Sequence, residues 1–199
     1  SHRSAAIIHG IQTLSIPDKL QVLGSGGATN SGLQYRQDEP SHRATILAGP
    51  GGLRVVDPVT ATIGSVRDTD FAEAMVIAES ALRSFPELTH SELHDSLMAV
   101  RRSRGSKNAH RVAAAMSPLS DSPAETLARV ALLNLGLEPV QQYQISTPFQ
   151  TFRVGAALVE HGVVVEVVGA PGHAPPQDVS PQDTPAQKAR EEAIRGEGW

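Results

Sequence analysis

Apolar and polar residues follow one another in patterns that divide this chain into three stretches. In the first, residues 1–56, apolar residues at helical spacing predict a short helix over 1–11. Short apolar runs between glycine-rich turns then predict strands, which cover residues 20–23, 33–36, 44–47 and 53–56. We therefore expect a small strand-containing N-terminal region.

The second stretch, residues 57–118, has the pattern of a helical region. Asp57 and Pro58 suit the cap and the first position of a helix. Thr89 and Glu92 have the spacing of a capping box, which opens another helix. The predicted helices begin at Pro58 and then cover residues 70–84, 89–101 and 105–116. The helix over 70–84 carries an apolar stripe made of Phe71, Ala74, Met75, Ala78 and Leu82.

The third stretch, residues 119–199, combines two helices with three strands. Ser122 and Glu125 form a second capping-box pattern, and the helix that they open should end at Gly136. Strands are predicted over 140–147, 151–159 and 162–168, the last two as a hairpin, followed by a proline-rich loop and a helix over 186–195. The whole pattern predicts an α/β protein.

The amino-acid composition limits the kinds of functional site and partner that this chain can have. The chain has no cysteine, which excludes disulfides, thiolate zinc sites and a cysteine nucleophile. A net charge of −4 argues against a protein that coats nucleic acid over its whole surface, but it leaves room for a local basic patch. No apolar run approaches the ~20 residues that span a bilayer, so we expect a soluble, cytoplasmic protein without a membrane partner. We also expect both ends to lie within a longer protein, since the chain opens at Ser1 without a methionine and stops at Trp199, directly after a glycine.

Four segments, in this order, resemble an actinobacterial protein family. They are SHRSAAIIHGI (1–11), GLRVVDPVTATIGSV (52–66), SPAETLARVALLNLGLEP (122–139) and REEAIRGEGW (190–199). The family joins an N-terminal winged helix of the type IV antitoxin regulator kind, which would precede Ser1, to a C-terminal domain similar to very-short-patch repair endonucleases. The resemblance implies a restriction-endonuclease-like αβββα domain of the PD-(D/E)XK kind over residues 119–199.

The resemblance also implies a metal site, but this chain lacks some of the carboxylates that form the site in the family. Such nucleases hold Mg²⁺ with carboxylates on adjacent strands. Where the family has an aspartate on the second strand, this chain has Gly155, and where it has Glu and Asp on the third strand, this chain has Glu166 and Val168. A single remaining carboxylate binds Mg²⁺ poorly, so the expected site is vestigial: it comprises Glu125, Glu166 and Lys188, with Gly155 and Val168 at lost carboxylate positions, and no metal.

Each of these residues also has an ordinary structural explanation. Glu125 either faces the vestigial site or belongs to the capping box of its helix. Glu166 either faces the old cleft or pairs with a cation such as Arg153 or Lys188. Basic residues such as Lys188 and Arg190 are common on any surface helix. His161 and His173 have no second histidine at metal spacing, so we expect both to be solvated loop residues. The glycine-rich segment 24–32 lacks the lysine and the spacing of a phosphate-binding loop, so we expect it to be a flexible turn.

A run of basic residues lies at the junction of two predicted helices. Five of the seventeen basic residues fall within eleven positions, and a phosphate-contacting surface and a solvated helix junction explain them equally well. They are Arg101, Arg102, Arg104, Lys107 and Arg111. No aromatic residue interleaves with them, so stacking on single-stranded bases has no support.

The expected function is that of a DNA-associated, non-cleaving protein derived from a nuclease, with a regulatory or defence role of the toxin–antitoxin kind that the resemblance supplies. Two alternatives stay open: an active PD-(D/E)XK endonuclease, and a protein-interaction scaffold without nucleic acid. No cofactor is expected, and Mg²⁺ enters only with the nuclease alternative. DNA and a protein are the partners left open.

Overall fold

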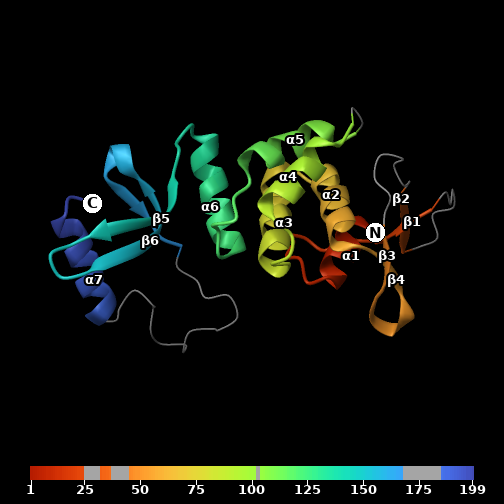
Figure 1. Ribbon diagram of the computed structural model, residues 1–199, viewed down its shortest axis with the longest axis horizontal. Helices are drawn as coiled ribbons and strands as arrows, with labels where there is room; N and C mark the ends of the chain where they lie inside the picture. The colour runs from red at the N-terminus through yellow and green to blue at the C-terminus, as the bar shows by residue number, and fades with distance from the viewer. Residues whose placement is uncertain (25–31, 37–44, 102–103, 168–184) are drawn as a thin grey trace. The chain divides into compact units, whose positions relative to one another are not determined.

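The computed structural model describes residues 1–24, 32–36, 45–101, 104–167 and 185–199 (Figure 1). It confirms an α/β fold, in which helices accompany small sheets. The chain forms two compact units, Ser1–Pro118 (unit 1) and Leu119–Trp199 (unit 2), which are described separately. The strand-containing region 1–56 and the helical region 57–118 both belong to unit 1.

Unit 1 contains several helices, and three of them begin at a residue whose side chain caps the helix. The Asp57 carboxylate accepts a hydrogen bond from Thr60 N (2.9 Å), and Asp70 does the same for Glu73 N (3.0 Å). Thr89 forms a complete capping box with Glu92. Such caps satisfy N–H groups that the helix itself leaves without partners. The helices are α1 (His2–Ile8), α2 (Pro58–Asp68), α3 (Phe71–Ser84), α4 (His90–Met98) and α5 (Ser106–Ala115).

The core of unit 1 is centred on α3, which contacts both α2 and α5. Met75 and Ile77 of α3 are fully buried, and so are Leu93 and Leu97 of α4. Burying a side chain of this size contributes about 1.5–3 kcal/mol. All residues from Glu73 to Ala81 of α3 are buried, so this part of the helix is covered on every side and not only along the predicted stripe.

Two pairs of short strands stand beside these helices. β1 (Leu20–Leu23) pairs with β2 (Leu33–Arg36) in parallel, and β3 (Ile46–Ala48) pairs with β4 (Arg54–Val56) antiparallel across the 3-10 turn Pro50–Gly52. The strand predicted over 44–47 is displaced toward Ala48, and its first residue lies outside the described residues. Residues 25–31 of the glycine-rich segment are also outside them.

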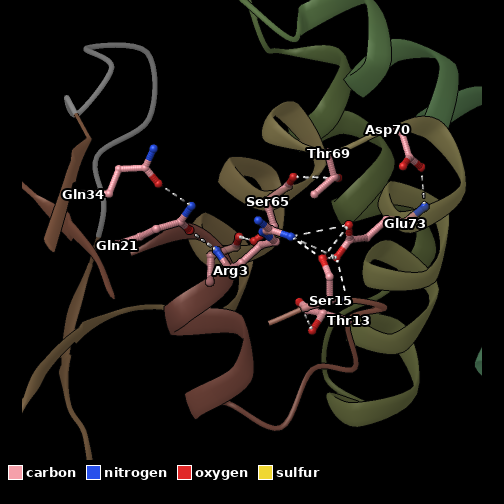
Figure 2. Close-up of polar contacts among 10 residues, drawn as sticks. Arg3, Thr13, Ser15, Gln21, Gln34, Ser65, Thr69, Asp70 and Glu73 are labelled. Carbon is pink, nitrogen blue, oxygen red and sulfur yellow. Dashed lines mark hydrogen bonds and ion pairs between the residues drawn. The ribbon is translucent and has the colours of Figure 1, made fainter. Parts of the chain in front are cut away.

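A polar cluster ties the N-terminal segment of unit 1 to α3 (Figure 2). Arg3 Nη1 lies 3.3 Å from Glu73 Oε1 and donates to Ser15 Oγ at 2.6 Å, while the Ser15 hydroxyl donates to Glu73 at 3.0 Å. On the other side of α1, Gln21 accepts from Arg3 N (2.9 Å) and donates to Gln34 (3.2 Å). The Arg3 and Glu73 side chains are only 20% and 10% exposed, so they stabilise each other in a partly dry environment.

Unit 2 has the element order helix, three antiparallel strands, helix. The elements are α6 (Pro123–Asn134), β5 (Val140–Ser146), β6 (Thr151–Leu158), β7 (Val163–Val165) and α7 (Pro185–Gly196). The sheet order is β5-β6-β7, and β6 and β7 are joined by the 3-10 turn Val159–His161.

An apolar cluster on the sheet and α7 forms the core of unit 2. Ile145, Val154, Ala157 and Ile194 are buried in it, and Tyr143 packs on Trp199 with ring centroids 5.2 Å apart.

β7 is shorter than the strand predicted over 162–168. Its pairing with β6 runs from Val163 to Val165, where Val165 pairs with Ala156, and Val168 lies outside the described residues. On β5, Gln142 has a left-handed backbone (φ 52°).

Candidate functional site

Two of the residues assigned to the vestigial site lie together in unit 2. Glu125 of α6 and Gly155 of β6 line the same small cavity, with Arg129 and Gln141. Its volume of about 20 Å³ has room for about one water. Val168, the other lost carboxylate position, lies outside the described residues.

Glu125 is used to stabilise the start of α6. Its backbone N–H donates to Ser122 Oγ (3.2 Å), and its carboxylate accepts from the backbone N–H of Asp121 (2.8 Å). The second contact reaches one residue before the N-cap, a variant of the capping box. Of the two explanations for Glu125, the structure therefore shows the helix cap.

Glu166 forms an ion pair, and its partner differs from both of the expected ones. Arg190 Nη2 of α7 donates to Glu166 Oε1 at 2.8 Å and also to the carbonyl oxygen of Arg153 at 2.9 Å. The Arg153 guanidinium lies instead 3.3 Å from Asp121. Of the two explanations for Glu166, the structure therefore shows pairing with a cation, and that cation is Arg190, which α7 places against the end of β7.

The described part of the chain contains no group of three or more His, Asp or Glu side chains able to hold a metal ion. A Cβ built on Gly155 would have one neighbour within 4 Å, Val165 O at 3.4 Å, so the backbone has room for a Cβ at this position. Lys188 is exposed on α7 and does not line the cavity, and His161 is exposed in the turn before β7. His173 lies outside the described residues.

The basic run lies in unit 1, where α5 begins beside the end of α2. Arg101, Arg104, Lys107 and Arg111 are all exposed, whereas Arg102 lies outside the described residues. The structure adds a fifth cation, Arg67 in the last turn of α2, which donates through Nε and Nη2 to Arg104 O (3.2 and 2.9 Å). We call Arg67, Arg101, Arg104, Lys107 and Arg111 the α5 basic surface.

Close backbone packing fixes this corner. Gly105, the N-cap of α5, has φ 80°, and a Cβ there would lie 2.7 Å from Arg67 Cβ and overlap its carbonyl oxygen. Asn108 donates to Val66 O (2.8 Å) and Thr69 O (3.0 Å), and so satisfies carbonyls near the end of α2. Arg111 lies over the ring of Phe71, 4.2 Å from its centroid. The backbone that carries these cations is thus held in place.

Charge is distributed unequally between the two units. Unit 1 has twelve Lys and Arg against eleven Asp and Glu, whereas unit 2 has five against ten. From Arg101 to Pro118 the sequence contains no acidic residue. The α5 basic surface therefore belongs to unit 1, whereas unit 2 has an excess of acidic residues. Sequence reasoning missed Arg67 because only the fold brings residue 67 beside residue 104.

Comparison of the chain with protein-family models, with curated proteins and with solved structures gives no match. Within the ranges that the structure describes, every helix is too short or too polar to cross a bilayer.

Proposed function

We propose that this protein binds duplex DNA through the α5 basic surface of unit 1, and that unit 2 is a nuclease-derived domain that does not cleave. The observation that carries the proposal is a set of five cations on a fixed helix corner, four of which lie in a segment, Arg101–Pro118, without acidic residues. Cations held in this way neutralise phosphates and release the counterions condensed on DNA.

The non-cleaving part of the proposal rests on the fate of the expected carboxylates. Glu125 caps its helix, Glu166 pairs with Arg190, and position 155 is glycine. Cleavage of a phosphodiester by this chemistry needs carboxylates free to bind Mg²⁺. A regulatory or defence role of the toxin–antitoxin kind remains part of the proposal through the family resemblance alone.

A binding titration with a fluorescently labelled duplex tests the proposal. The variant Arg104→Ala/Lys107→Ala should bind more weakly than the parent protein, and by the same factor on unrelated sequences, because phosphate contacts position a protein without reading bases. The control Lys19→Ala/Arg54→Ala removes two exposed cations elsewhere in unit 1 and should leave the affinity nearly unchanged.

Three results would contradict the proposal in different ways. Equal loss in both variants would show that net charge alone attracts the DNA. Absence of binding by the parent protein would favour an interaction scaffold without nucleic acid. Metal-dependent cleavage would favour the nuclease.

A further inference from the structure

Unit 1 has an open groove at the N-terminal end of α2, of about 600 Å³. Its walls come from the start of α2, the end of α3, the link between α3 and α4, and the exposed side of α4. The apolar part consists of Pro58, Val59, Phe85 and Leu88, which are all half-buried and so still present apolar surface to solvent. The volume lies within the range of sites that bind small ligands or the side chains of a partner.

Among the described residues that line this groove, the charged ones are all carboxylates. They are Asp57, Glu87, Glu92 and Asp95, which surround the apolar part. Asp57 and Glu92 are held in place by their helix caps, in which both carboxylates accept backbone hydrogen bonds. Glu87 is exposed, and the Asp95 side chain is 77% exposed beside His94. An apolar floor inside an acidic rim selects for a partner that is both apolar and cationic.

We propose that this groove docks an amphipathic helix of a protein partner, with apolar residues on one face and Lys or Arg beside them. Helices commonly bind in grooves by placing residues i, i+3, i+4 and i+7 on an apolar floor, and flanking charges then set orientation and choice of partner.

This surface is distinct from the α5 basic surface. The groove lies at the first turn of α2 and Arg67 in the last turn, which for an eleven-residue helix are separated by about 15 Å. Unit 1 therefore presents opposite charges at the two ends of one helix, and the two partners do not compete for the same residues. The inference does not depend on DNA binding.

A titration followed by amide NMR shifts on the full chain tests the docking. The probe is a synthetic fourteen-residue helical peptide with leucines at i, i+3, i+4 and i+7 and lysines beside them; a control peptide has glutamate in place of every lysine. The lysine peptide should shift the amides of Val59, Phe85, Leu88 and Ser96 saturably, and the glutamate peptide should not.

Matched variants separate the groove from general attraction to an acidic protein. Glu87→Gln/Asp95→Asn should weaken the lysine peptide roughly three- to tenfold, as expected for two exposed charges. Glu138→Gln/Glu160→Gln, which neutralises two exposed carboxylates of unit 2, should change the affinity less than twofold. Leu88→Ser should weaken binding without changing net charge. Equal effects of the two double variants, shifts centred on unit 2, or equal binding of both peptides would each overturn the proposal.

Discussion

Gly105 packs directly against the backbone of Arg67 within the α5 basic surface. We therefore expect Gly105→Ala to destabilise unit 1. Two separate effects act at this position. The left-handed backbone (φ 80°) disfavours any residue with a Cβ, and that Cβ would overlap the carbonyl of Arg67. Gly10 has nearly the same conformation (φ 77°) but no atom within 4 Å of the added Cβ, so Gly10→Ala measures the first effect alone.

The expected loss in the free energy of unfolding follows from the cost of each of these two effects. A left-handed conformation costs an L-residue about 1–2 kcal/mol, and about 0.4–1 kcal/mol of this is offset by the lower entropy of the unfolded chain. Gly10→Ala should therefore cost about 1 kcal/mol. At Gly105 the backbone must also move to relieve the overlap, which adds about 1–3 kcal/mol as for other overpacked sites. The total at Gly105 is about 2–4 kcal/mol.

Urea unfolding of both variants provides the measurement, with the thermal midpoint as a second readout. At about 4 °C per kcal/mol, Gly105→Ala should lower the midpoint by about 8–16 °C and Gly10→Ala by about 4 °C. Gly105→Ala should also weaken DNA binding, because the backbone that positions Arg104 must shift. Equal destabilisation by the two substitutions would refute the packing of α5 against the end of α2.

Three further predictions concern catalysis, pH and the polar cluster. Purified protein should leave supercoiled DNA intact with Mg²⁺ or Mn²⁺, and nicking that disappears in Glu166→Gln would reveal a working nuclease site. Burial lowers the pKa of His2 from 6.5 to about 4, so the unfolded state binds more protons between these values. The free energy of unfolding should therefore fall as pH drops from about 6.5 to 4, and a pH series with His2→Gln should lack this component. Glu73→Gln, which removes the charge that faces Arg3, should cost about 2 kcal/mol in urea unfolding, whereas the exposed Glu191→Gln should cost less than about 0.5 kcal/mol.

Local signals in the sequence were sufficient to predict where most helices begin. Asp57, Asp70, Thr89 and Ser122 cap the helices that follow them, and each cap depends only on residues three positions away. The three strands of unit 2 follow from β-branched runs and turn residues in the same local way. The end of β7 at Val165 could not be predicted, because the valine-rich run continues to Val168 in the sequence.

Long-range contacts decided the parts of the candidate sites that the sequence left open. The sequence offers several cations in unit 2 as partners for Glu166, and the placement of α7 brings Arg190 to it. Arg67 belongs to the α5 basic surface only because α2 ends beside Arg104. A pattern along one segment carries no information about which distant segment it will meet, so these pairings required the structure.

The salt dependence of duplex binding tests the central claim most directly. Each neutralised phosphate contributes about 0.9 to the slope of log K against log salt concentration. If the α5 basic surface contacts the backbone, Arg104→Ala/Lys107→Ala should reduce the magnitude of that slope by about two units, and Lys19→Ala/Arg54→Ala should leave it unchanged. An identical slope for the parent protein and Arg104→Ala/Lys107→Ala would contradict the assignment of DNA to this surface.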